Sequence, residues 1–161
     1  MGSQGRTFTA ARLELTERDD FCARNALTAV AKSATSLVIF GGQDSQQERQ
    51  FNEVYRLDLA TLTLSQHEYP DGAITPPARN SHTLTKSTAD PSKAYLFGGA
   101  NQDGPLKDLY ELDLDSLAFT KIALDETEMN LPMMEMHSAH ILNGTHLLLI
   151  GGRKLEVGQP L

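Results

Sequence analysis

The sequence predicts an all-β fold built from a repeated four-stranded unit. Three observations indicate it: short apolar runs that each end at a pair of glycines, an alternating pattern after each of the first two pairs, and landmarks that recur about every 55 residues. Tyr55 and Tyr110 are 55 residues apart, as are Arg24 and Arg79. The glycine pairs, 57 and then 53 residues apart, are Gly41-Gly42, Gly98-Gly99 and Gly151-Gly152.

The strands of each unit follow from its local pattern. The apolar runs 37–40, 94–97 and 147–150 are too short for helices, and their aliphatic and aromatic residues are typical of strands buried on both faces. The segments "VYRLDL" and "LYELDL" alternate, which predicts half-buried strands. A tight connection then leads to strands centred on Leu64 and Phe119. Further strands are expected before the apolar runs, at residues 26–31, 81–86 and 138–142.

Four antiparallel strands in about 50 residues match one blade of a β-propeller. The glycine pairs have a reason in this architecture. Glycine alone tolerates a positive φ angle and a close approach of neighbouring backbone, which the end of a strand near a crowded axis requires.

The repeated residues resemble the Kelch-repeat family. In the second unit the match consists of Arg79, His82, Gly98, Gly99, Tyr110, Asp113 and Phe119. In the first unit it consists of Arg24, Gly41, Gly42, Tyr55, Asp58 and Leu64. The chain has no tryptophan, so Phe119 and Leu64 stand at the family's tryptophan position, and the third unit is read with His137 at the arginine position and His140 repeating His82. The resemblance implies a Kelch β-propeller and says little about function.

The strand count predicts a partial propeller over residues 1–161. Residues 7–14 are read as a lone outer strand, residues 24–67 and 79–123 as complete blades, and residues 137–152 as the first half of a third blade. Because a closed propeller has at least four blades, the apolar flanks need cover. We expect missing C-terminal blades to complete the ring. A homodimer is the second reading, and an open arc covered by a partner is the third.

Charge and cysteine content restrict the class of protein. With 14 basic and 21 acidic residues, the net charge of −7 disfavours nucleic-acid binding and docking on an anionic membrane. The single cysteine, Cys22, forms no internal disulfide, and no apolar signal segment or membrane-spanning stretch is present in the sequence. These features favour a reduced, cytoplasmic compartment.

No catalytic, cofactor-binding or metal-binding constellation stands out. His137 and His140 are expected on opposite faces of one strand, which is poor geometry for one metal ion. The acidic runs 16–20 and 125–128 are typical of solvated loops, and the glycine-rich segments lead to strands rather than to the helix of a phosphate-binding loop. The chain is therefore expected not to be an enzyme.

The resemblance implies that the segments entering each first strand face the mouth that grips peptide ligands. The candidate partner-binding residues are Arg24, Asn25, Arg79, Asn80, Ser81 and His137. In the competing structural interpretation, Arg24 and Arg79 pair with acidic side chains between blades. The loops at residues 43–51 and 100–107 differ in length and composition, as expected of segments that choose a partner.

The sequence thus predicts a non-catalytic protein–protein interaction module, a scaffold or adaptor. The alternatives are the non-catalytic propeller part of a larger enzyme, or a propeller enzyme that handles a small molecule.

Overall fold

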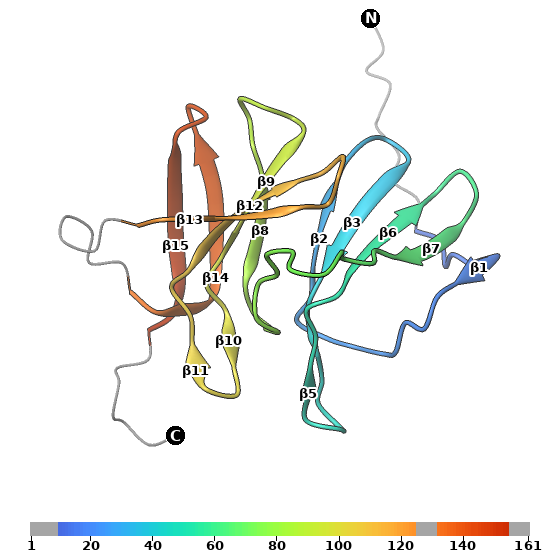
Figure 1. Cartoon of the computed structure of the whole chain (residues 1–161), viewed down its shortest axis with the longest axis horizontal. Helices are drawn as coiled ribbons and strands as arrows, with labels where there is room; N and C mark the ends of the chain where they lie inside the picture. Colours follow the sequence, from blue (N-terminus) through green and yellow to red (C-terminus); the bar gives the residue numbers. More distant parts are fainter. Residues whose placement is uncertain (1–9, 125–131, 155–161) are drawn as a thin grey trace, which may run out of the picture.

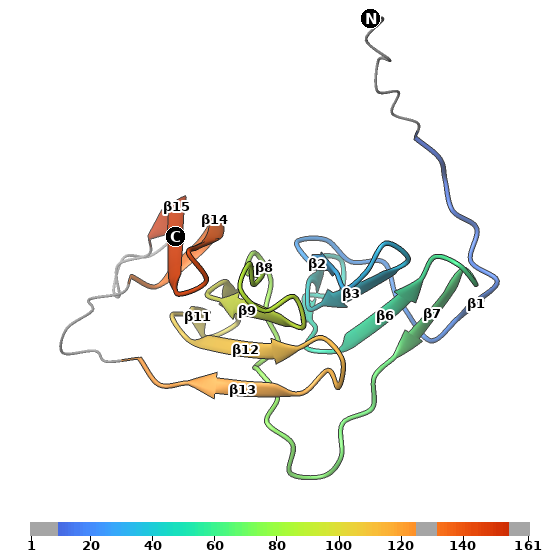
Figure 2. The ribbon, with the colours of Figure 1, turned by 90° about the horizontal axis from the view of Figure 1, so that it is seen from above.

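The computed structural model describes residues 10–124 and 132–154, and these residues form strands and loops without a helix. Three main groups of strands stand side by side in a row (Figure 1). Seen from above, β2, β8 and β14 lie on the same side of this row (Figure 2). No sheet of the described residues closes on itself, so the all-β, partial-propeller prediction is confirmed.

The first sheet contains one blade and a short extra strand at its outer edge, in the order β1-β7-β6-β3-β2. The four blade strands pair antiparallel, whereas β1 runs parallel to β7. The strands are β1 (Glu17–Arg18), β2 (Thr28–Ala31), β3 (Ser36–Phe40), β6 (Val54–Asp58) and β7 (Thr63–Gln66).

The predicted lone outer strand at 7–14 is wrong for residues 10–14, which belong to no strand; residues 7–9 lie outside the described part. The alternating pattern there has no sheet edge beside it, and Leu13 is half exposed. The chain reaches the sheet only at Thr16, whose backbone N–H donates to the carbonyl oxygen of Leu62 at 2.9 Å. The short strand β1 follows directly.

The second sheet is a four-stranded antiparallel blade in the order β13-β12-β9-β8. Its strands are β8 (Thr83–Lys86), β9 (Lys93–Phe97), β12 (Leu109–Asp113) and β13 (Phe119–Ile122). The third group is a hairpin of two nine-residue strands, β14 (Met134–Leu142) and β15 (His146–Lys154).

Each sheet has two faces, and the order of the repeats defines them. The trailing face points to the next sheet along the chain, and the leading face points to the previous one. Side chains from the first sheet's trailing face and the second sheet's leading face form one buried cluster, which includes Val30, Val38, Phe40, Val54, Leu84, Ala94, Leu96 and Leu112. Burying each large apolar side chain contributes about 1.5–3 kcal/mol, so this junction is the main core of the molecule.

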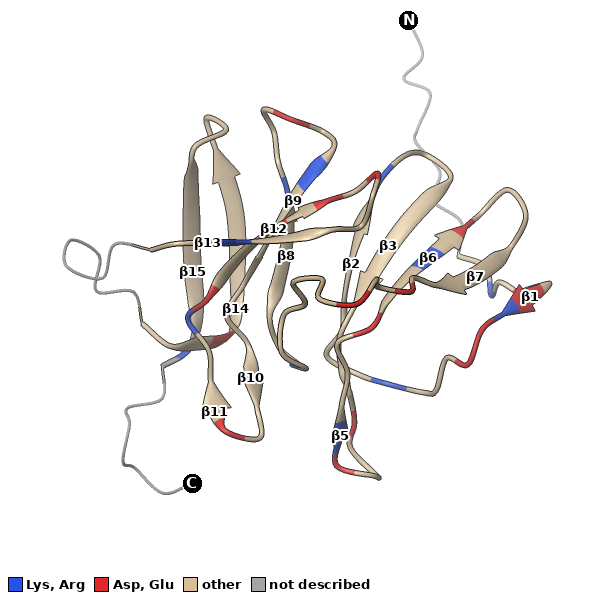
Figure 3. Cartoon of the chain, viewed as in Figure 1, with Lys and Arg blue, Asp and Glu red and all other residues tan. Residues whose placement is uncertain are grey.

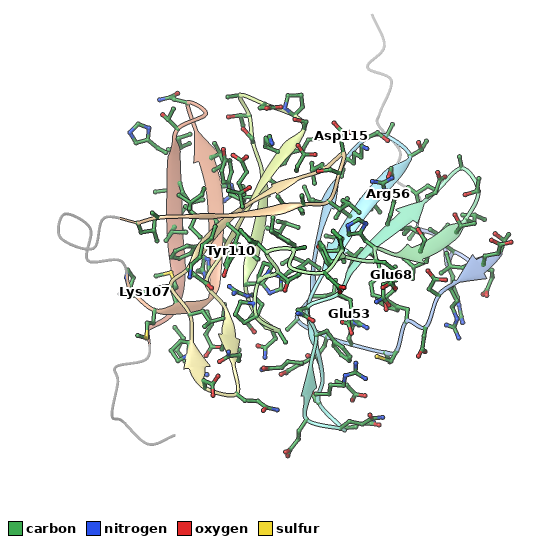
Figure 4. The ribbon with its side chains drawn as sticks, in the orientation of Figure 1. Glu53, Arg56, Glu68, Lys107, Tyr110 and Asp115 are labelled. Atoms are coloured by element: carbon green, nitrogen blue, oxygen red, sulfur yellow. The ribbon has the colours of Figure 1, made fainter. Side chains whose placement is uncertain are left out.

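Polar groups close the turn end of the same junction. The carboxylate of Asp115, in the second sheet, forms an ion pair with Lys32 at 2.7 Å. The backbone carbonyl oxygen of Asp115 accepts a hydrogen bond from Arg56 at 3.2 Å. Figure 4 shows Arg56 and Asp115 where the first and second sheets meet. Lys86 donates in the opposite direction, to the carbonyl oxygen of Ala31 at 2.7 Å. The two sheets are therefore joined by hydrogen bonds as well as by apolar packing.

The glycine pairs correct the predicted alignment of the third unit. A Cβ atom added to Gly42, Gly99 or Gly152 would meet the Cβ atom of Leu27, His82 or His137, respectively, within 2.7–2.9 Å. His137 is therefore the equivalent of His82, and Met134 takes the place of Arg24 and Arg79. The prediction that placed His137 at the arginine position and His140 at the His82 position is wrong. The alignment failed because its spacing varies: Leu27, His82 and His137 precede the second glycine of their pairs by 15, 17 and 15 residues, respectively. The second unit is therefore a poor guide to the third.

The corrected alignment reveals one polar contact that occurs at both junctions. His82 Nε2 lies 2.7 Å from Thr28 Oγ1, and His137 Nε2 lies 2.9 Å from Thr83 Oγ1. Each imidazole also packs edge-on against a phenylalanine of the preceding sheet, His82 against Phe40 and His137 against Phe97. Each histidine thus joins its own sheet to the one before it.

Backbone hydrogen bonds repeat in the same way. The Ser81 N–H donates to the Ala26 carbonyl at 3.0 Å, and the Met136 N–H donates to the Ser81 carbonyl at 2.9 Å. All three residues have φ angles of 51–57°, in the left-handed region. The Gly42 N–H donates to the Arg79 carbonyl at 2.9 Å, and the Gly99 N–H to the Met134 carbonyl at 2.8 Å.

The buried imidazole of His82 makes the stability of the chain depend on pH. Burial, assisted by the nearby Arg79 charge, lowers the pKa of His82 from its ordinary 6.5 to about 3. Below the unfolded pKa the unfolded chain takes up a proton that the folded chain does not, so stability is lost as the pH falls from that value toward the folded pKa. Between about pH 7.5 and about pH 5.5 we expect His82 to remove about 1.4 kcal/mol of unfolding free energy.

Urea unfolding of wild type and His82→Leu at both pH values measures this effect. Leucine is the natural residue at the equivalent position, Leu27. The variant is expected to lose less stability on acidification than wild type, by that amount. The same pH dependence in both proteins would contradict the assignment.

Candidate protein-interaction surface

Two hairpins project on the same side of the sheets, each directly after a glycine pair (Figure 1). The first is formed by β4 (Gln43–Asp44) and β5 (Arg49–Gln50), and the second by β10 (Ala100–Asn101) and β11 (Gly104–Pro105). Asp44 Oδ1 accepts the N–H of Gln46 at 2.9 Å, and Asn101 Oδ1 accepts the N–H of Asp103 at 2.9 Å. These side chains fix the turns locally, as Asp and Asn often do.

A groove of about 480 Å³ lies between the two hairpins. Gln102 Nε2 donates to the carbonyl oxygen of Glu48 at 3.2 Å and thereby links one hairpin to the other. The residues that line the groove are Gln47, Glu48, Arg49, Gln50, Ala78, Asn101, Gln102 and Asp103. Amide groups dominate this set, and each can both donate and accept hydrogen bonds.

The lining of the groove includes two acidic residues. Glu48 and Asp103 are exposed in the turn segments of the two hairpins. Figure 3 shows acidic residues in red at both hairpin tips. Arg49 is the one basic residue of the lining, and its guanidinium pairs with Glu53 at 3.4 Å. Part of the positive charge is thereby neutralised by a residue outside the groove, and the lining itself has two acidic residues and one basic residue.

A smaller pocket of about 180 Å³ adjoins the groove and shares Gln47 and Arg49 with it. Arg24 is part of its lining, with the guanidinium carbon 3.7 Å from the ring centre of Phe51 and 4.5 Å from that of Phe21. The aromatic rings and the cation hold each other in place.

The two arginines predicted to bind a partner are buried. The Arg79 side chain has no exposed surface and donates both Nη atoms to Asp108, at 2.6 and 2.8 Å. The Arg24 side chain is 1% exposed and lies 3.3 Å from Glu53. Both acidic partners belong to the arginine's own blade, so the alternative expectation of pairing between blades is also wrong. It failed because each arginine precedes its own first strand and reaches the nearby start of its own third strand.

The other predicted site residues are distributed between the surface and the junction. Asn25 is exposed and donates to Ser45 Oγ at 2.9 Å, whereas Asn80 is buried and donates to Gln43 Oε1 at 2.8 Å. Both asparagines therefore support the first hairpin. Ser81 is half-buried, and His137 is buried at the junction with the second sheet.

The sequence did not identify any single residue of the groove as part of a site. The sequence signal that pointed to them was the variation of the two loops, which the structure places side by side although they are 54 residues apart at their contact. Nothing in the order of residues shows that the two tips touch.

Among the described residues, no group of three or more His, Cys, Asp or Glu side chains is arranged to hold a metal ion. The part of the chain that the structure describes also contains no helix long and apolar enough to cross a membrane.

Comparison with known proteins gives matches over most of the chain. The model of the KLHDC2/KLHL20/DRC7 Kelch-repeats domain matches residues 6–159. A putative adagio-like protein 2 of Oryza sativa subsp. japonica is 32% identical over 116 residues, which are 72% of this chain and 18% of that protein. The Rho GTPase-activating protein gacHH of Dictyostelium discoideum is 26% identical over 83% of this chain and 8% of its own length.

A human relative extends the same pattern. The multiple epidermal growth factor-like domains protein 8 of Homo sapiens is 29% identical over 94% of this chain and 5% of its own length. The chain thus spans less than a fifth of the curated relatives that it matches.

Proposed function

Since the chain belongs to the family of Kelch-repeat domains, we propose that it is a non-catalytic scaffold or adaptor that holds a partner protein. The binding site is the groove between the β4–β5 and β10–β11 hairpins, and the ligand is an extended segment of the partner with at least one basic residue.

The observation that carries this proposal is the pairing of an amide-lined groove with acidic tips. Side-chain amides at Gln47, Gln50 and Asn101 match the alternating donors and acceptors of an extended peptide backbone. Glu48 and Asp103 supply charge for a lysine or arginine at the rim. Opposite charges across such a rim favour rapid association and discriminate against acidic segments.

The rigid support of the groove favours the same function. Each hairpin follows a glycine pair packed against the neighbouring sheet, and Asn25 and Asn80 hold the first hairpin from two different sheets. Preorganised loops lose little conformational freedom on binding, which leaves more of the contact energy for affinity.

Selection of peptides from a random phage-displayed library on the immobilised chain tests the proposal. We expect enriched peptides to contain lysine or arginine. Glu48→Lys combined with Asp103→Lys is expected to weaken their binding at least about tenfold, because two favourable rim charges become repulsive. Fluorescence polarisation with a labelled selected peptide measures the change.

Asp71→Lys is the matched control, because Asp71 is also an exposed loop acid but lies outside the groove. It should leave the affinity of the peptide unchanged. Enriched peptides without basic residues, or binding that the double variant does not alter, would contradict the assigned groove.

A further inference from the structure

The trailing face of the β14–β15 hairpin has no sheet against it among the described residues, and it presents Leu142, Leu148 and Ile150 together with the exposed His140 and His146. Ile150 is 53% exposed and Leu148 is 41% exposed. Ser138 pairs with Ile150 across the two strands and is exposed beside it. Adjacent exposed aliphatic residues of this kind mark an interaction surface.

The repeat identifies what this face is built to contact. Counted from the glycine pairs, Ile150 and Leu148 are equivalent to Phe40 and Val38, which are fully buried against the second sheet. Ser138 is equivalent to Thr28, whose hydroxyl bonds His82 of the following sheet. The face therefore repeats the apolar pair and the hydroxyl group of a trailing face that already occurs in the chain, with His140 in the place of the buried Val30.

The complementary half of the junction is present in the same chain, on the leading face of the first sheet. Leu37 and Ile39 are equivalent to Ala94 and Leu96, which are fully buried at the junction, but they are themselves only half-buried. Ala29, equivalent to the buried Leu84, is exposed. The chain thus contains two complete junctions and the two separate halves of a third.

We propose that the trailing face of the β14–β15 hairpin binds the leading face of the first sheet of a second copy of this chain, head to tail. Leu27 of the second copy occupies the place that His82 and His137 have at the internal junctions, so this contact is apolar and lacks the hydroxyl–imidazole hydrogen bond of those junctions. The Gly152 N–H bonds the Arg24 carbonyl of the second copy, as the Gly42 N–H bonds the Arg79 carbonyl within the chain.

The backbone hydrogen bonds that join successive sheets would extend across this interface. Within the chain, Ser81 donates to Ala26 and Met136 donates to Ser81. In the assembly the Ala26 N–H of one copy donates to the Met136 carbonyl of the other. Because the two contacting surfaces differ, the interface is heterologous, and further copies can add in the same way until a ring closes.

Light scattering coupled to size-exclusion chromatography tests this assembly. Wild type is expected to have a mass of at least twice the 17.6 kDa of one chain. Ile150→Glu places a charge on the trailing face, and Ala29→Glu places one on the leading face. Each single variant is therefore expected to be a monomer. Ile74→Glu is the matched control, because Ile74 is also 53% exposed but lies in the loop between the first two sheets, and it should associate as wild type does.

Mixing the two single variants gives the decisive result. An Ala29→Glu copy keeps its trailing face and an Ile150→Glu copy keeps its leading face, so the mixture should form one intact junction and a species of two chains. This restoration also shows that both variants are folded. A dimer built from two like faces would not be restored, and such a result would overturn the proposal.

A monomeric wild type at the highest soluble concentration would equally overturn it. The trailing face would then be covered by another occupant, such as a further blade of a longer chain or a different protein.

Discussion

Replacing Arg79 with alanine is expected to lower the free energy of unfolding by about 3–5 kcal/mol. The guanidinium is fully buried and forms two bonds to Asp108, one to the Gly98 carbonyl at 3.0 Å and one to the Pro77 carbonyl at 3.1 Å. Its removal leaves the largely buried Asp108 carboxylate without its cation. Urea unfolding monitored by circular dichroism measures the change.

The double variant Arg79→Ala with Asp108→Ala separates the lost pair from the unpaired charge. It is expected to be more stable than Arg79→Ala alone, since no unpaired carboxylate remains. Arg24→Ala should cost less than Arg79→Ala, because Glu53 retains its contact with Arg49. A loss below about 1 kcal/mol for Arg79→Ala would show that this ion pair is not a main support of the blade.

Gly98→Ala is expected to cost about 3 kcal/mol of unfolding free energy. Gly98 has a φ angle of +64°, in which alanine costs about 1–2 kcal/mol. A Cβ atom there would lie 2.5 Å from the Met134 carbonyl oxygen, which must move away. That carbonyl accepts the Gly99 N–H at 2.8 Å, and losing the bond costs about 1 kcal/mol more.

Gly151→Ala is the matched comparison within the same repeat. Gly151 has nearly the same φ angle, +70°, but no heavy atom within 4 Å of an added Cβ. Gly151→Ala should lower the unfolding free energy only by the cost of the positive φ angle, about 1–2 kcal/mol. Both proteins of this comparison carry Ile150→Glu, so that no second copy covers the face beside Gly151. Equal costs for the two glycine variants would show that close packing at the junction contributes nothing.

The fold could be predicted because its determinants are local. A glycine pair after a short apolar run needs no knowledge of the rest of the chain, and the alternation in "VYRLDL" and "LYELDL" marks the next strand directly. The prediction failed at residues 10–14, where a strand-like pattern has no neighbouring edge to pair with. A pattern shows which residues can form a strand, whereas pairing also requires a free edge within reach.

The site was predictable only at the level of loops. Arg24 and Arg79 have the charge and position expected of ligand-binding residues, but burial and nearby carboxylates give both a structural role. The contact between Gln102 and Glu48 depends on the rotation from one sheet to the next, which no short segment of sequence specifies. His137 was misaligned because the spacing to the glycine differs between units.

The junctions are held in part by main-chain atoms, through the N–H groups of Gly42, Gly99, Ser81 and Met136. Their geometry is consequently insensitive to which side chains occupy the projecting tips a few residues away. Substitutions among the amides and acids there are therefore expected to leave the angle between successive sheets unchanged. The main-chain atoms that set the architecture and the side chains that we propose to bind a partner thus lie within a few residues of one another.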